Sequence, residues 1–126
     1  MQSLIYGRTE RSPKIAYAAS GQGEVAVFFL HGIGGNKSNW TEQLDYFGSR
    51  GFRAIAWDVR GYADSEDFEG KFDFCDISAD LAALMDHLGV RRAHFVGLSM
   101  GGRILMDFGH RYPDRIHTLT ICGAFP

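Results

Sequence analysis

The sequence has 126 residues, of which 45% are hydrophobic and 22% are charged, and its formal net charge is −2. This balance is typical of one globular domain, and it argues against nucleic-acid partners because no basic face or stripe stands out. No apolar run reaches the roughly 18 residues that span a bilayer, and the N-terminus lacks the layout of a signal peptide, so we expect a cytoplasmic protein without a membrane partner. Cys75 and Cys122 are far apart in the sequence, which favours two reduced thiols over a disulfide.

Short segments with apolar patterns recur along the chain and predict strands. Residues 3–8 and 14–20 alternate in polarity and are separated by "TERSP", which indicates a hairpin. Residues 25–30 are almost unbroken apolar, a pattern typical of a strand buried on both faces of a sheet. Similar segments occupy residues 52–58, 92–99 and 116–125.

Helical patterns fall between these strands, at residues 39–51, 76–90 and 102–114. In the first, Asn39 with Glu42 is expected to cap the helix start. In the second, Asp76 is the expected N-cap and Gly89 the expected C-cap. Strands that alternate with helices predict an α/β fold, with a mostly parallel sheet and helices on both faces.

Ser99 lies between a predicted strand and a predicted helix, within the segment "GLSMGG". In open parallel sheets, chemistry takes place beyond the carboxyl ends of the strands, which is where this serine is expected. A nucleophile on so tight a turn needs small neighbours, and Gly97, Gly101 and Gly102 meet that demand. Ser99 is therefore a candidate nucleophile. The alternative is a serine in an ordinary glycine-rich turn.

A second glycine-rich segment, "LHGIGGNKSNW" (residues 30–40), follows the first buried strand and should open on the same edge of the sheet. Acyl transfer needs two donors aimed at the developing oxyanion. The N–H of Met100, directly after the serine, is one candidate donor, and the N–H of Ile33 is the other. The glycines alone would also suit a phosphate, but the segment lacks the Lys-Ser/Thr ending of a P-loop.

Three segments together resemble the α/β-hydrolase fold family: "HGIGG" (residues 31–35), "WDVRGYADS" (57–65) and "GLSMGG" (97–102). Ala63 stands where the family usually has a glycine. The resemblance implies that Ser99 is the nucleophile and that the N–H groups of Ile33 and Met100 form the oxyanion hole, with no cofactor and no metal.

The same resemblance implies that His31 and Asp58 shape loops and do not act as catalysts. Its "SMGG" form is similar to small-molecule esterases, lactonases and C–C bond hydrolases. A serine at position 99, where an aspartate would be needed, speaks against dehalogenase or epoxide-hydrolase chemistry.

A serine hydrolase of this kind needs an acid and then a histidine after the serine in the chain. The acids after Ser99 are Asp107 and Asp114, and the histidines are His110 and His117. Two of these four residues fall inside the helix that runs away from the serine, and two flank the start of the last strand, so we expect no triad in this chain. We therefore interpret residues 1–126 as the N-terminal part of a single hydrolase domain, truncated after the sixth strand, with the lid and C-terminal part absent.

Three functions remain open at this point. The function we expect is that the intact parent is a serine hydrolase of small esters or related acyl compounds, including lactone, thioester and C–C bond substrates. The alternatives are a non-catalytic receptor-type relative that binds a small molecule, and a half-domain interaction protein. Since nothing follows to pair with the strand at residues 116–125, we expect self-association or pairing with the missing C-terminal half.

Overall fold

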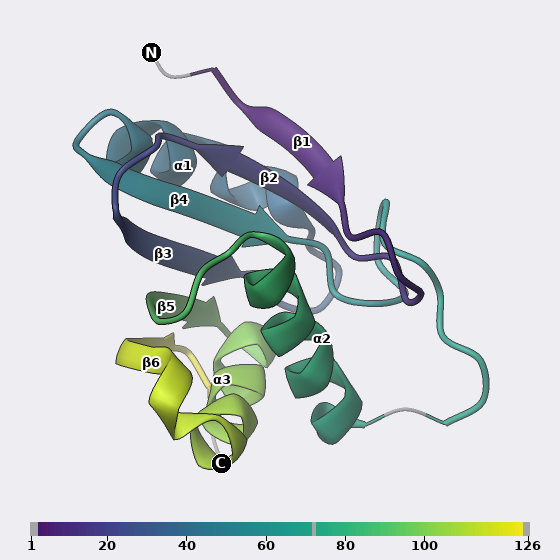
Figure 1. Cartoon of the computed structure of the whole chain (residues 1–126). Coiled ribbons are helices and arrows are strands. Elements are labelled where there is room, and N and C mark those ends of the chain that lie inside the picture. Colours follow the sequence, from purple (N-terminus) through teal and green to yellow (C-terminus); the bar gives the residue numbers. More distant parts are fainter. Residues whose placement is uncertain (1–2, 72, 125–126) are drawn as a thin grey trace.

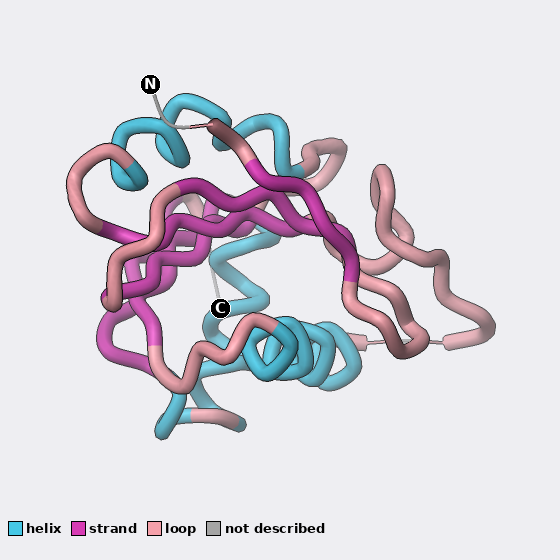
Figure 2. The backbone as a smooth tube through the Cα atoms, turned by 45° about the horizontal axis from the view of Figure 1, so that its top comes forward, coloured by secondary structure: helices cyan, strands magenta, loops and turns pink. Residues whose placement is uncertain are grey.

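The computed structural model describes residues 3–71 and 73–124 and shows one twisted sheet between layers of helices (Figures 1 and 2). The six strands have the order β1-β2-β4-β3-β5-β6. Their bounds are β1 Ile5–Arg8, β2 Ala16–Ser20, β3 Val25–Leu30, β4 Phe52–Trp57, β5 Ala93–Leu98 and β6 Ile116–Cys122. The first two strands form the predicted antiparallel hairpin, and β4, β3, β5 and β6 run parallel to one another. The predicted α/β class and the mostly parallel sheet are confirmed.

Helices cover both faces of the sheet, as the alternating pattern predicts. The helical elements are η1 Lys37–Trp40, α1 Thr41–Gly48, α2 Phe74–His87, α3 Met100–Arg111 and the short η2 Pro113–Arg115. In Figure 2, α1 lies on one side of the strands, and α2 and α3 lie on the other. In the part of the chain that the structure describes, no helix has the length and apolarity that crossing a bilayer requires.

Each face of the sheet has its own apolar core, because successive strand residues point to opposite faces. Phe28 of β3 and Phe95 of β5 are buried beneath α2 and α3, and their rings stack with centroids 5.4 Å apart. On the opposite face, Phe29 packs against Trp40 and Phe47 beside α1. Burial on both faces explains the nearly continuous apolar run of β3 in the sequence.

Each N-cap predicted from the sequence lies three residues after the N-cap in the structure. Asn36, not Asn39, is the first cap of the segment before α1: its side chain accepts the Ser38 N–H, while Asn39 supplies the return bond. The residue before α1 itself is Trp40, which makes no side-chain cap bond. The prediction of Asn39 with Glu42 was wrong because the chain makes a 3₁₀ turn before the α-helix begins.

The same displacement occurs at α2. Asp73 is the N-cap, and the expected cap Asp76 is the third helical residue, whose carboxylate accepts the Asp73 N–H at 2.8 Å. A capping box contains two polar residues three positions apart, and the sequence analysis chose the second of them. At the other end, Leu88 is the C-cap, and Gly89 follows it with φ +69°, a conformation that glycine adopts without strain.

Candidate active site

Ser99 occupies the sharp turn between β5 and α3. Its φ of +54° and ψ of −114° are unusual for a residue with a side chain. Such strained backbone persists only where the surroundings enforce it, and it is typical of a nucleophile on a strand-to-helix turn. The Ser99 N–H donates to the Cys122 carbonyl at 2.8 Å, which fixes the turn to the end of β6. The serine is exposed to solvent.

The glycines beside Ser99 allow α3 to lie directly on the sheet. A Cβ at Gly97 would lie 2.6 Å from the carbonyl carbon of Gly101. A Cβ at Gly101 would overlap the backbone carbonyl of Leu30 in β3. Both obstacles are backbone atoms, which cannot rotate away as a side chain can. The requirement for small residues around the serine is thus a packing requirement of the helix against β3 and β5.

The loop after β3 reaches the serine from the neighbouring strand. Leu30 pairs with Gly97 across the parallel ladder, so the two strands end side by side. A Cβ at Gly32 would lie 3.2 Å from the Ser99 Cβ and 3.8 Å from its Oγ, which shows how closely the loop approaches. The sequence prediction that both segments open on one edge of the sheet is confirmed.

The two candidate oxyanion donors come from these two segments. Met100 is the first residue of α3, so its N–H has no acceptor within the helix. Ile33 follows Gly32 in the loop, and its side chain is 80% exposed. The structure thus places Ile33 one residue from the point where the loop meets Ser99.

His31 is buried beneath the loop, with a relative exposure of 1%. Its Nε2 accepts the Val59 N–H at 3.1 Å, and its Nδ1 lies 2.8 Å from the Gly32 carbonyl oxygen. Burial lowers the pKa of His31 below its ordinary value, in spite of the opposing effects of the Gly32 carbonyl and Asp58. Both ring nitrogens are engaged, so this neutral imidazole serves the structure of the loop and does not act as a base.

Asp58 joins the loop after β4 to the loop after β3. Its carboxylate is fully buried and accepts both the Lys37 N–H, at 2.8 Å, and the Lys37 ammonium, at 2.6 Å. Lys37 also reaches the exposed Asp64 at 2.6 Å. Burial alone would lower the pKa of Lys37, but its hydrogen bonds to the two carboxylates raise it above its ordinary value. Asp58 thus has the loop-shaping position that the family resemblance implied.

The sequence analysis did not single out Lys37 or Tyr62, although Lys37 lies in the loop after β3 and Tyr62 contacts His31 and Met100. The ring of Tyr62, in the loop after β4, lies 5.0 Å from the His31 ring, and its hydroxyl lies 3.7 Å from the Met100 sulfur. Both contacts join residues that are far apart in the chain, so no local sequence pattern predicts them. A lysine inside a glycine-rich loop, followed by an aspartate at the end of the next strand, was the available signal for the Lys37–Asp58 pair.

The acids and histidines that follow Ser99 in the chain lie away from the turn between β5 and α3. Asp107 is within α3, where it accepts hydrogen bonds from Ser78 and Arg111, and His110 follows it on the same helix. Asp114 lies in η2 and His117 near the start of β6, which pairs with the start of β5 and not with its Ser99 end. Among the described residues, no cluster of three or more His, Cys, Asp or Glu side chains is placed to hold a metal ion.

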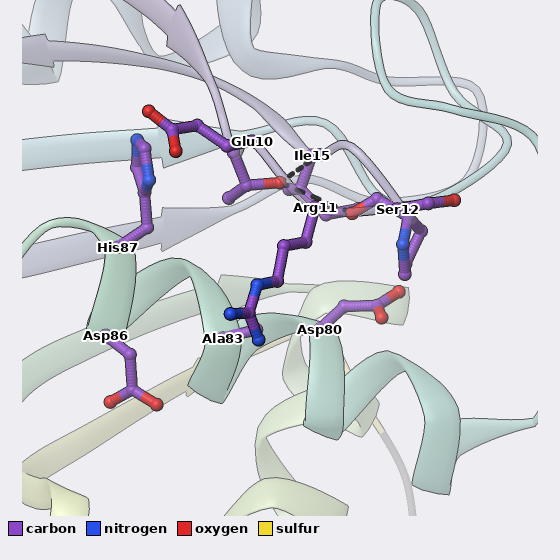
Figure 3. A pocket seen from close by; sticks show the side chains of 10 residues that line it. Glu10, Arg11, Ser12, Ile15, Asp80, Ala83, Asp86 and His87 are labelled. Atoms are coloured by element: carbon purple, nitrogen blue, oxygen red, sulfur yellow. Dashed lines mark hydrogen bonds between the residues drawn. The ribbon is translucent and has the colours of Figure 1, made fainter.

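A separate pocket of about 480 Å³ lies between the β1–β2 connection and α2. Figure 3 shows Arg11 extending across it toward α2, with Glu10 near His87 at one end. None of Ser99, Ile33 and Met100 lines this pocket. It is therefore distinct from the candidate active site.

The fold and the serine turn define an α/β hydrolase. The family model described as "alpha/beta hydrolase fold" matches residues 25–126, so the chain belongs to this family.

Among curated proteins, the chain is 34% identical over 115 residues to a 2-hydroxy-6-oxononadienedioate/2-hydroxy-6-oxononatrienedioate hydrolase of Burkholderia vietnamiensis, covering 88% of this chain and 40% of that protein. It is 32% identical over 117 residues to 3-oxoadipate enol-lactonase 2 of Acinetobacter baylyi, covering 92% of this chain and 43% of that protein. The chain therefore spans less than half the length of these relatives.

Among solved structures, the crystal structure of an epoxide hydrolase from Vigna radiata superposes with a TM-score of 0.89 at 30% identity, covering 94% of this chain and 38% of that one. The fold of this chain is thus shared with an enzyme that is named as an epoxide hydrolase.

Proposed function

We propose that this chain carries the nucleophile and the oxyanion hole of a serine hydrolase that acts on small esters or related acyl compounds. The observation that supports this most strongly is the backbone of Ser99, which adopts φ +54° on an exposed turn at the carboxyl end of β5. A non-glycine residue is held in such a conformation at a cost of order 1–3 kcal/mol, and functional sites are where such strain concentrates.

In the proposed reaction, the Ser99 Oγ attacks the carbonyl carbon of the substrate while a general base takes its proton. The carbonyl oxygen becomes an oxyanion, which the N–H groups of Ile33 and Met100 stabilise. The intermediate collapses to an acyl-enzyme on Ser99, and the protonated base gives its proton to the leaving group. Water then attacks the acyl-enzyme and releases the acid. The acid and histidine of the triad are proposed to lie outside residues 1–126.

Two of the similar proteins bear on the substrate class. One is named as a hydrolase of an oxononadienedioate and the other as an enol-lactonase. Both names denote small oxygen-rich acyl compounds, so we propose that lactones and C–C bond substrates are candidates beside simple esters. Epoxide opening is not proposed, although an epoxide hydrolase has the same fold, because Ser99 provides a hydroxyl where that chemistry requires a carboxylate nucleophile.

The test is treatment of the purified chain with p-nitrophenyl acetate. For the chain alone we expect turnover well below about 1 s⁻¹, because residual catalysis without a complete triad comes from the oxyanion hole alone. Turnover at or above that rate would show that the chain contains a base that the proposal overlooks. A longer protein that supplies the acid and histidine should transfer the acetyl group to Ser99, where peptide mass spectrometry locates it. In that longer protein, acetylation elsewhere with Ser99 unmodified would contradict the proposal and favour a receptor-type protein.

A further inference from the structure

A pocket of about 410 Å³ lies at the edge of the sheet opposite Ser99. Because β3, β4, β5 and β6 run parallel, their amino ends share one edge, whereas Ser99 follows the carboxyl end of β5 at the other edge. The residues that line the pocket come from the β2–β3 and α2–β5 connections and from the starts of β3, β4 and β6. The pocket is therefore separate from the candidate active site.

The lining of this pocket is positively charged. It includes the side chains of Arg53, Arg91 and Arg92. His117 lines the pocket too, and Glu24 is the acid among the described lining residues, so three guanidinium groups face one carboxylate. The whole chain, in contrast, has a formal net charge of −2. In the described part of the chain, no carboxylate forms an ion pair with any of the three guanidinium groups. A hollow lined by unneutralised charges of one sign concentrates ions of the opposite sign.

Two of the arginine side chains are held in place by backbone carbonyl groups. The Arg53 Nη1 donates to the Leu88 carbonyl at 2.8 Å, and the Arg92 Nε donates to the Asp114 carbonyl at 2.8 Å. A carbonyl oxygen fixes a guanidinium without neutralising its charge. Since a guanidinium has five N–H donors in a fixed plane, each of these side chains keeps further donors for a ligand.

The connection that carries Arg91 and Arg92 is itself fixed by Arg115. The Arg115 Nε donates to the Arg91 carbonyl at 2.7 Å, and its Nη2 donates to the Val90 carbonyl at 2.9 Å. The charge of Arg115 is matched by the Asp86 carboxylate at 2.9 Å. The two pocket arginines thus extend from a backbone that is already ordered, which lowers the entropy lost when a ligand binds.

A β-bulge places His117 at the pocket. The ladder between β5 and β6 shifts register between the pair Ala93–Ile116 and the pair His94–Thr118, so His117 is the extra residue. Bulges re-aim side chains and are frequent beside functional sites. The ring of His117 packs on that of His94, with centroids 5.2 Å apart. The imidazole adds a donor of another kind to the arginines.

We propose that this pocket binds the phosphate group of a small phosphorylated molecule. A phosphate monoester carries about −1.5 to −2 charges at neutral pH and has three strong acceptor oxygens. Its charge matches the excess positive charge of the lining, and its oxygens match donors that come from β4, β6 and the α2–β5 connection. A carboxylate has one charge and a planar shape, so it would leave several of these donors unpaired.

The size of the pocket favours an organic phosphate over a free phosphate ion. A volume of about 410 Å³ is within the range of small-molecule pockets and leaves room for an organic group beside the phosphate. Solvated arginines on an ordinary surface would extend into water, whereas here carbonyl bonds and a bulge keep the donors around one hollow. The inference does not depend on the reaction proposed for Ser99.

The test is an NMR titration of the isotope-labelled chain with inorganic phosphate and with glycerol phosphate, at an ionic strength held constant with sodium chloride. We expect the backbone amides of Gly89 to Arg92 and of His117 to shift and to saturate, with a Kd of about 1 mM or below for glycerol phosphate. Acetate should bind at least about tenfold more weakly, because it offers less charge and fewer acceptors. If residues 1–126 do not fold alone, the longer protein that contains them is titrated in the same way.

The variant that tests the site is Arg91→Gln, which removes one charge and leaves the hydrogen bonds of Arg53, Arg92 and Arg115 in place. We expect it to raise the Kd for glycerol phosphate by about threefold or more, and the addition of Arg92→Gln to raise it by about tenfold or more. The matched control is Arg11→Gln, which removes the same charge at the pocket between the β1–β2 connection and α2. Since that pocket is separate, the control should change the Kd by less than about twofold.

Shifts that grow in proportion to the phosphate concentration without saturating would overturn the inference, because anions that gather loosely around exposed arginines behave in this way. An equal Kd in the wild type and in the variant with both Arg91→Gln and Arg92→Gln would overturn it as well. If that double variant does not fold, Arg91→Gln alone decides: an unchanged Kd overturns the inference, and the expected increase supports it. Binding of inorganic phosphate without binding of glycerol phosphate would indicate a site for the free ion and would overturn the assignment to a phosphorylated molecule.

Discussion

Ala63 has a backbone conformation that residues with side chains rarely adopt, with φ +41° in the loop after β4. The left-handed region costs an L-residue roughly 1–2 kcal/mol, and glycine avoids this cost although it loses about 0.5–1 kcal/mol more entropy on folding. The side chain is exposed, so a substitution by glycine removes no packing. In the family that this chain resembles, a glycine is usual at this position.

We therefore expect Ala63→Gly to raise the free energy of unfolding by about 0.5–1 kcal/mol, measured by urea denaturation. The matched control is Ala83→Gly on the exposed side of α2, which should lower the same quantity by about 1 kcal/mol because glycine is a poor helix former. A loss of stability in Ala63→Gly comparable to that of the control would contradict the assignment of strain to this position.

The parts of the site that the sequence predicts are those encoded locally. The serine turn and the glycine-rich loop after β3 each follow directly on an apolar run that predicts a strand, so the sequence locates both of them. The Lys37–Asp58 ion pair and the Tyr62 contacts join segments that meet only after the sheet has formed. Local patterns carry no information on such pairs. The place of His31 in the loop could therefore be predicted from the sequence, whereas its hydrogen bond with the Val59 N–H could not.

At the scale of the elements, the sequence predicts strands better than helix starts. Buried parallel strands are continuous apolar runs, which are hard to misread, and all four such segments form β3 to β6. The helix starts depend on side-chain bonds three residues apart, and Asn36 and Asp73 each precede a second polar residue that also fits the pattern. Which of the two caps the helix is decided by the local backbone, and the sequence does not show it.

The packing of α3 against β3 provides a test at the same scale. Gly101→Ala places a methyl group against the Leu30 carbonyl, and because overpacking a rigid contact typically costs 1–3 kcal/mol, we expect a loss of at least about 2 kcal/mol in stability. Gly109→Ala in the same helix meets only the end of the Leu119 side chain, which can move. Thermal unfolding of both variants should show a large decrease for the first and little change or a small gain for the second. A similar small gain in both would mean that helix propensity and not the close approach controls this position.

For the whole molecule, the open strand β6 is the feature with the clearest consequence. It pairs with β5 on one side, and its residues from His117 to Cys122 are exposed. Within residues 3–71 and 73–124, α1 contacts β2 and β4 but no helix on its side of the sheet covers β5 or β6. A strand edge with free N–H and C=O groups recruits another chain, so we propose that this chain associates through β6.

Sedimentation velocity tests the proposed association. We expect dimers or larger species at about 100 μM, within the range where exposed strand edges lead to association. Thr120→Lys places a charge on β6 and should shift the distribution toward monomer, whereas Gln22→Lys adds the same charge in the exposed β2–β3 loop and should not. A wild-type chain that sediments as a monomer at this concentration would refute the proposal.

The claim on which the proposed function depends is that Ser99 is the nucleophile, and site-specific labelling measures this most directly. The longer protein that supplies the proposed acid and histidine is incubated with a fluorophosphonate probe and the modified peptide is identified by mass spectrometry, beside its Ser99→Ala variant and the exposed control Ser49→Ala. We predict one adduct per chain, on Ser99, that disappears in Ser99→Ala and persists in Ser49→Ala. An adduct that survives in a folded Ser99→Ala chain would contradict the account, because the reactive hydroxyl would then lie outside the turn between β5 and α3.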